Sequence, residues 1–328
     1  MSSNDLQTTA TDTSRLTSTL ASPGLVTVFG AGGFIGRYVV QELAKRGARI
    51  RAAVRVPHEA FYLKPLAGLG QLDIARADVT HEGSVRAACE GADAVVNLVG
   101  ILDGDFESVQ LGGSRNVADA AADVGARRFV QISAIGADAG SEIAYQRTKG
   151  LAEGHVREVM PSATILRPSI VFGPEDEFLN RFATMMRALP KMLLVAADAR
   201  FQPVYVADLA EAIARAATDN IANGQTLEMG GPAEVTMRDL FHYIARTIGA
   251  DENFIELPDF IVGRVAKAVG WLPGAPMTHD QWQMLQQPNV VTGENGLAVF
   301  GIDPTPMQAV ASAWLTRYRT QGRFTKAA

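Results

Sequence analysis

A glycine-rich stretch near the amino terminus constrains the fold more than any other feature of this chain. Residues 25–36 read LVTVFGAGGFIG, and residues at helical spacing follow. The apolar, partly β-branched run predicts a buried strand. Gly30, Gly33 and Gly36 are therefore expected at a strand-to-helix turn, where glycine permits positive φ and close approach of a ligand to the backbone. The N–H groups at the helix start suit a pyrophosphate, so the stretch indicates dinucleotide binding.

The next strand indicates which dinucleotide is bound. Residues 49–54 (RIRAAV) form this expected strand, whose end faces the adenosine ribose in a dinucleotide fold. An acidic residue there would bind the free 2′-hydroxyl of NAD, but none is present. Arg51 and Arg55 stand there, and a guanidinium suits a 2′-phosphate. Because Arg55 lies just past the strand, it is the better candidate, and NADP is favoured over NAD.

Strands and helices then alternate along the first half of the chain. The expected strands are 72–77, 94–99, 128–132 and 164–166, and the expected helices are 82–89, 109–124 and 145–159. This alternation predicts a doubly wound parallel sheet with right-handed crossovers. Ligands bind at the carboxyl ends of such strands, where Asp78 and Val79, Gly100 and Ser133 follow three of them.

Composition excludes several other classes of protein. The 328 residues are 47% hydrophobic and 20% charged, which is ordinary for a globular chain of about two domains. The net charge of −5 argues against nucleic-acid binding, and the single cysteine, Cys89, excludes a cysteine-based metal cluster. No run reaches the ~18 apolar residues of a transmembrane helix. We expect a disordered leader over 1–23, a dinucleotide-binding domain over 24–168 and a smaller α/β domain over 169–328.

Taken together, these motifs resemble the short-chain dehydrogenase/reductase family, of the extended, atypical kind. The residues that carry the resemblance are Gly30–Gly36 (GAGGFIG), Asp78-Val79, the strand end Asn97–Gly100, Ser133, the YQRTK motif from Tyr145 to Lys149, and Arg167-Pro168. They occur in the family's order over about the first 175 residues. Each is weak alone, but the set is specific. The resemblance implies a Rossmann-type fold.

The second half resembles one branch of that family, the nucleotide-binding accessory subunits of respiratory complex I and their bacterial relatives. The matching stretches are 171–183 (VFGPEDEFLNRFA), 202–208 (QPVYVAD) and 297–304. This resemblance implies an NADPH-binding protein beside the quinone-reducing arm of complex I. It also implies a location on the cytoplasmic, inner face of the cell membrane, or on the matrix side in mitochondria. It further implies that the nucleotide is held tightly and not turned over.

The resemblance implies a cofactor site with residues from six positions along the sheet. They are Gly30, Gly33, Phe34, Ile35, Gly36, Arg55, Asp78, Val79, Gly100, Tyr145, Lys149 and Pro168. No metal is expected.

The resemblance also implies a catalytic set made of Ser133, Tyr145 and Lys149. Tyr145 and Lys149 are four residues apart and therefore share a helix face. A phenol with a usual pKa near ~10 is a poor acid or base at neutral pH unless a cation stabilises its phenolate. Lys149 would supply that charge, and Ser133 would orient the substrate oxygen. The family commonly has an asparagine that completes a proton relay, whereas this sequence has Gln110 there, which puts efficient turnover in doubt.

Residues 259–272 are the most informative stretch of the second half. They contain an apolar face, the cations Arg264 and Lys267, and Trp271 at the end. Such a helix lies in a membrane interface, against a partner, or against its own domain, and the pattern does not decide between them. Two functions stay open: an NADPH-binding accessory subunit of complex I, and an NADPH-dependent oxidoreductase acting on a quinone-related or isoprenoid intermediate. A sugar-nucleotide epimerase fits less well.

Overall fold

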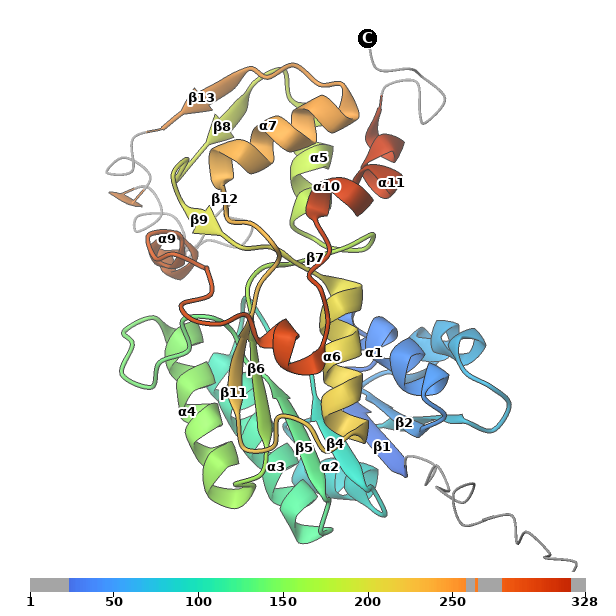
Figure 1. Cartoon of the computed structure of the whole chain (residues 1–328). Helices are drawn as coiled ribbons and strands as arrows, with labels where there is room; N and C mark the ends of the chain where they lie inside the picture. Colours follow the sequence, from blue (N-terminus) through green and yellow to red (C-terminus); the bar gives the residue numbers. More distant parts are fainter. Residues whose placement is uncertain (1–23, 258–262, 265–278, 320–328) are drawn as a thin grey trace, which may run out of the picture.

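A computed structural model of the chain describes residues 24–257, 263–264 and 279–319. The expected leader and most of the amphipathic stretch 259–272 lie outside the described residues. Within them, a large sheet with helices on both faces forms the lower part of the molecule in Figure 1, and a smaller group of helices and short strands forms the upper part. This confirms the predicted doubly wound fold with a smaller second part.

The large sheet has seven strands in the order β11-β6-β5-β4-β1-β2-β3, and every neighbouring pair is parallel. Its strands are β1 (Leu25–Phe29), β2 (Arg49–Val54), β3 (Leu72–Arg76), β4 (Ala94–Asn97), β5 (Arg128–Ile132), β6 (Thr164–Pro168) and β11 (Thr226–Met229). The strand order reverses between β1 and β4. In an open parallel sheet that reversal point is where ligands bind, beyond the carboxyl ends of the strands.

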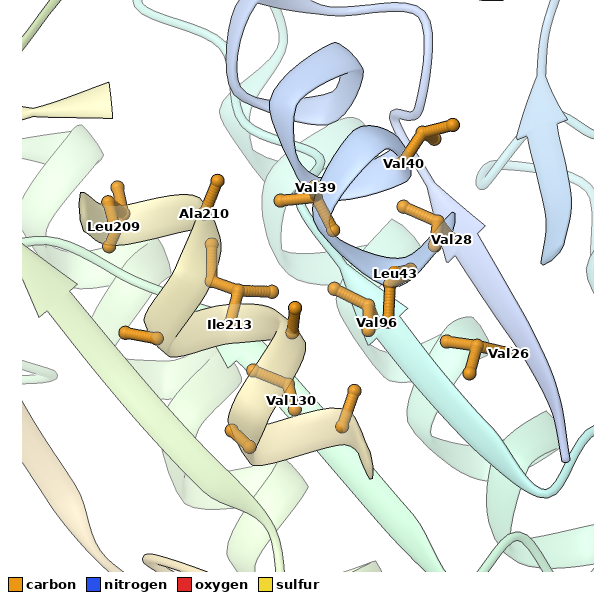
Figure 2. Close-up of a cluster of buried hydrophobic side chains, with 14 of the residues drawn as sticks. Val26, Val28, Val39, Val40, Leu43, Val96, Val130, Leu209, Ala210 and Ile213 are labelled. Carbon is orange, nitrogen blue, oxygen red and sulfur yellow. The ribbon is translucent and has the colours of Figure 1, made fainter. Parts of the chain in front are cut away.

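Apolar side chains cover both faces of this sheet, which explains why its strands are continuously hydrophobic in sequence. On one face, Val28 of β1 and Val96 of β4 pack under α1 (Phe34–Lys45) and α6 (Val206–Thr218), as Figure 2 shows. On the other, Phe29 and Val95 pack against α2 (Glu82–Cys89), α3 (Gly113–Asp123) and α4 (Ala144–Val159). The predicted helix 82–89 is confirmed.

The upper part has its own apolar core, in which Phe172, Leu240 and Phe241 are fully or almost fully buried. Its helices are α5 (Leu179–Ala188), α7 (Met237–Ile248), α10 (Met307–Val310) and α11 (Ser312–Leu315), with η5 (Thr316–Tyr318). Its short strands are β8 (Met192–Leu194), β9 (Arg200–Phe201), β12 (Val235–Thr236) and β13 (Phe254–Glu256). Trp314 and Leu315 are buried in this core.

The chain crosses between the two parts several times after residue 168. It leaves the sheet through β7 (Val171–Phe172), which pairs with β10 (Val204–Tyr205), and returns through α6 and β11. After α9 (His279–Leu285), η4 (Gly296–Phe300) packs on β11. Both halves of the sequence therefore build the large sheet (Figure 1).

One expected helix differs in the structure. The one expected over 109–124 begins as a π-helix, η3 (Phe106–Gly112), and becomes α3 only at Gly113. Near the end of the described residues, the short helices α10, α11 and η5 follow one another in place of one continuous helix. Helix α7 begins with a capping box: the Thr236 side chain accepts from the backbone N–H of Asp239, whose carboxylate accepts from the backbone N–H of Thr236.

Candidate functional site

The glycine turn joins β1 to α1 at the point where the strand order reverses. Of its three glycines only Gly30 has a positive φ, +78°. Gly36 is required for a different reason: a Cβ there would lie 2.3 Å from the carbonyl oxygen of Gly30. Helix α1 has neither a side-chain cap nor an acidic residue in its first turn. Its positive end is therefore not neutralised from within the helix, which suits a bound anion.

Phe34 and Ile35 are the first two residues of α1 and are both half-buried. Ile35 packs against the apolar core, and the ring of Phe34 meets that of Tyr38 edge-on at 6.1 Å between centroids. Their backbone, at the first turn of the helix, is the part positioned for an anion.

The two arginines of β2 differ in what they contact. Arg51 donates to the carbonyl oxygens of Ala88 at 2.8 Å and Glu90 at 2.7 Å, so its guanidinium holds the end of α2. Arg55 is exposed just beyond the strand and makes no hydrogen bond or ion pair with the described residues. Arg55 therefore remains available for a ligand, whereas Arg51 does not.

Asp78 and Val79 follow β3 at the same edge of the sheet. The Asp78 carboxylate accepts hydrogen bonds from the backbone and side chain of Thr80, and these bonds hold its pKa below the usual value. Val79 is buried, and a Cβ added to Gly113 would lie 2.6 Å from the Val79 side chain. Asp78 thus stabilises the turn that follows β3, while Val79 packs against Gly113 at the start of α3.

Lys149 of α4 reaches the ends of β4 and β5. Its side chain is buried, with 4% exposure, and its Nζ donates to the carbonyl oxygen of Ile132 at 3.1 Å. A Cβ on Gly100 would lie 3.2 Å from the same Nζ. Ser133, next to Ile132, is buried, and its Oγ has no partner among the described residues. The structure therefore brings Gly100, Ser133 and Lys149 together.

Tyr145 lies one turn before Lys149 and is half-buried, with its ring edge-on to Phe106 of η3 at 6.0 Å between centroids. Burial raises the pKa of Tyr145 to about 12 and lowers the pKa of Lys149 to about 8. The negative charge of Glu153, one turn further along α4, partly opposes this lowering of the Lys149 pKa. The phenol is therefore a weaker acid than free tyrosine and stays protonated at neutral pH, where it can donate a hydrogen bond.

Gln110 lies in the π-helix η3 and is fully buried. Its Nε2 donates to the carbonyl oxygen of Tyr145 at 3.0 Å and to the Thr148 hydroxyl at 2.8 Å. It thereby ties η3 to α4, while its Oε1 has no partner in the described part of the chain. Pro168 is buried at the end of β6, and its carbonyl oxygen accepts from the backbone of Ile135, just beyond Ser133.

The sequence analysis did not assign two polar features to the site. The first is Asn97 at the end of β4, fully buried, which donates to Gln131 and Ser114 and accepts from the backbone of Val99. The second is the pair between Glu153 and Arg167. A signal existed for Glu153, because Tyr145, Lys149 and Glu153 recur every four residues and therefore share one helix face.

The described residues contain no group of three or more His, Cys, Asp or Glu side chains that could hold a metal ion. Likewise, no helix in the described ranges is long and apolar enough to cross a membrane.

A parallel sheet with a glycine turn at its reversal point, and a Tyr–Lys pair on the neighbouring helix, defines a dinucleotide-binding protein of the short-chain dehydrogenase/reductase type. The profile of the NAD(P)H-binding family matches residues 30–220. The chain is 35% identical over 308 residues to subunit 9 of the NADH dehydrogenase [ubiquinone] 1 alpha subcomplex of Mus musculus. The matched region covers 90% of this chain and 81% of the mouse protein. It is 28% identical to the 40 kDa subunit of NADH-ubiquinone oxidoreductase of Neurospora crassa, over 91% of this chain and 80% of that protein.

Among solved structures, an NADPH-dependent quinone oxidoreductase of Escherichia coli complexed with NADPH has a similar fold. It superposes with a TM-score of 0.71 at 21% identity, over 88% of this chain and 99% of that one. The chain therefore belongs to the NAD(P)H-binding family and, within it, to the family of complex I alpha subcomplex subunit 9.

Proposed function

We propose that this protein is an NADPH-binding accessory subunit of respiratory complex I, in which the nucleotide is bound but not turned over. The proposal rests on the family, since similar chains are named as complex I subunits, and on one observation at the site. Burial raises the pKa of Tyr145 to about 12, while the nearby Lys149 donates to a backbone carbonyl. The pair fits a role in holding a ribose better than a role in proton transfer.

The residues that would hold the dinucleotide lie along one edge of the sheet. The glycine turn with Phe34 and Ile35 would take the pyrophosphate, and Asp78 and Val79 would flank the adenine. Gly100, Tyr145, Lys149 and Pro168 would contact the nicotinamide half. The buried Oγ of Ser133 and Oε1 of Gln110, both without partners among the described residues, fit a site completed by a polar ligand. When bound, NADPH would carry hydride chemistry that this chain leaves unused.

Arg55 supports NADP over NAD. It is exposed at the end of β2, has no ion pair with the described residues, and no acidic side chain replaces it at the ribose position. A guanidinium there matches a 2′-phosphate.

Partners and location follow from the same proposal. The protein would contact complex I subunits near the quinone-reducing arm, on the inner face of the membrane. Residues 259–272, which lie outside the described residues, would add a peripheral membrane contact.

The decisive experiment uses protein purified without added nucleotide. It is denatured, the released dinucleotide is identified, and exchange of the native complex with added NADP is timed. We expect NADPH at near one per chain, with exchange slower than minutes. Rapid exchange, together with turnover of a quinone-related substrate that Tyr145→Phe abolishes, would instead identify an oxidoreductase.

Assembly is tested separately in the organism that makes the protein. Membranes solubilised in mild detergent are separated on a native gel, and the protein is expected to migrate with NADH-quinone reductase activity. Migration only as a free chain would contradict the accessory role while leaving nucleotide binding intact.

A further inference from the structure

Residues 173–178 (GPEDEF) run from the end of β7 to the start of α5, at the boundary between the two parts of the molecule (Figure 1). Their contact with the first part is close. A Cβ on Gly173 would lie 3.1 Å from the ring of Phe34 and 2.6 Å from Val206. Because Phe34 directly follows the glycine turn, the segment passes beside the expected pyrophosphate site.

The segment is held together from within by hydrogen bonds. Asp176 is buried, and its carboxylate accepts from the backbone N–H groups of Gly173 at 3.0 Å and Leu179 at 2.5 Å. The Asn180 side chain donates to the carbonyl oxygens of Pro174 and Asp176. These bonds fix the shape of the segment but do not attach it to α1.

Glu175 makes that attachment. Its Oε2 accepts a hydrogen bond of 2.6 Å from the Tyr38 hydroxyl, and its Oε1 lies 3.5 Å from Nη1 of Arg37. Burial, followed by the bond to Glu175, raises the pKa of Tyr38, so the phenol remains a donor at neutral pH. Both partners are on α1, whereas Glu175 is 137 residues away from Tyr38 in sequence.

The contacts continue from Arg37 to the glycine turn itself. The guanidinium carbon of Arg37 lies 4.9 Å from the centre of the Tyr62 ring, and the Tyr62 hydroxyl donates to the carbonyl oxygen of Gly32 at 2.7 Å. A continuous series of side chains therefore joins Glu175 to the turn that would hold the pyrophosphate.

We propose that Glu175 is a positioning residue that fastens segment 173–178 to α1 and thereby slows the release of the bound dinucleotide. This rests on the proposed function. The fastening is polar and partly exposed, with 40% exposure for the Glu175 side chain and 32% for Arg37, so solvent weakens it and it opens without unfolding the core. Opening at α1 breaks one hydrogen bond and one ion pair, and the remaining contact with α1, at Gly173, is van der Waals packing. A hydrogen bond of 3.1 Å from Arg317 of η5 to the carbonyl oxygen of Pro174 attaches the segment to the upper part and not to α1. Glu175 therefore controls the rate at which nucleotide leaves.

The test measures release of NADPH from the full chain. NADPH is loaded, excess NADP is added, and the decay of bound NADPH fluorescence gives the dissociation rate. We expect Glu175→Ala to raise this rate about tenfold, since it removes a charge-assisted hydrogen bond and an ion pair. Tyr38→Phe removes only the hydrogen bond and should give a smaller increase.

Glu177→Ala is the matched control. Glu177 lies in the same segment, carries the same charge, and makes no hydrogen bond or ion pair with the described residues, so its rate should equal that of the wild type. The melting temperature of nucleotide-free protein is measured alongside. A structural role alone would lower it in Glu175→Ala without faster release of NADPH, whereas the proposal expects faster release together with a fall of at most about 4 °C.

Each outcome decides between the two proposals. Wild-type protein that retains NADPH, with Glu175→Ala releasing it no faster than Glu177→Ala, overturns the role of Glu175 and leaves the proposed function standing. Wild-type protein that binds no NADPH at all overturns the proposed function, and the role of Glu175 with it.

Discussion

The Nζ of Lys149 donates a hydrogen bond of 3.1 Å to the carbonyl oxygen of Ile132, one residue before Ser133. A buried lysine is costly to keep charged, and burial lowers the pKa of Lys149 to about 8. The same hydrogen bond fixes the ammonium at the end of β5, where it lies beside Gly100. Holding the Lys149 cation at the place expected for the nicotinamide ribose therefore lowers the folding stability of the protein.

Lys149→Met should raise the stability of nucleotide-free protein at neutral pH. The unfolded chain binds the lysine proton up to about pH 10.5 and the folded chain only to about pH 8, so wild-type stability rises with pH across this window. At 1.36 kcal/mol per pKa unit the full effect is about 3 kcal/mol. Urea unfolding between pH 7 and 10 should show this rise in the wild type and not in Lys149→Met.

Lys191→Met is the control for that experiment, because Lys191 is exposed. Its stability should follow the wild-type pH curve. If the curve of Lys149→Met also ran parallel to that of the wild type, the pKa of Lys149 would not be lowered.

Arg55→Ala should change nucleotide preference without changing stability. Loss of a charge-assisted bond to a 2′-phosphate is expected to weaken NADPH binding about 10- to 100-fold and NADH binding little. Titration of each nucleotide by fluorescence gives both dissociation constants. Arg51→Ala is the contrasting variant: its guanidinium holds the carbonyl oxygens of Ala88 and Glu90, so it should lower stability and leave the preference unchanged. Equal losses for both nucleotides in Arg55→Ala would place the 2′-phosphate elsewhere.

Much of the site could be predicted because it lies at one edge of a parallel sheet. Gly30, Arg55, Asp78, Gly100, Ser133 and Pro168 each end or follow a strand, so strand recognition alone brings them to the same edge. Helical spacing of four likewise placed Tyr145 beside Lys149. These are local patterns, and local patterns determine which elements form.

Contacts between distant segments could not be predicted in the same way. Glu175 meets Tyr38 across 137 residues, and no periodicity links them. The return of β11 to the sheet and the π-helix at Gln110 depend on tertiary packing, since residues 106–112 carry no distinct signal for a π-helix. Proton affinities also depend on burial, which explains why the sequence pattern indicated an activated Tyr145 while the fold raises its pKa.

Gly36→Ala should disrupt the glycine turn. The added Cβ would lie 2.3 Å from the carbonyl oxygen of Gly30 and 2.5 Å from that of Ala31, both backbone atoms that cannot rotate away. Overpacking of this kind costs about 1–3 kcal/mol, and NADPH binding should fall with it. Gly83→Ala is the control: it lies in α2 with no atom within 4 Å of an added Cβ, so stability should stay equal or rise. Normal NADPH affinity in Gly36→Ala would show that the turn adjusts freely.

Glu153 and Arg167 form an ion pair, and the buried carboxylate of Glu153 acts on the pKa of Lys149. Arg167 donates to Glu153 through Nε at 2.8 Å and Nη2 at 2.6 Å, and the Glu153 side chain is only 6% exposed. Arg167→Met would leave that carboxylate buried and unpaired, at a cost of about 3–5 kcal/mol. The double variant Glu153→Met/Arg167→Met removes both charges and should cost clearly less than the sum of the single variants, as measured by urea unfolding in a double-mutant cycle.

Because the charge of Glu153 raises the pKa of Lys149 in the folded protein, the stability of the double variant should also begin to rise at a lower pH than that of the wild type. Additive single-variant costs and an unmoved pH curve would together mean that the pair acts independently of Lys149.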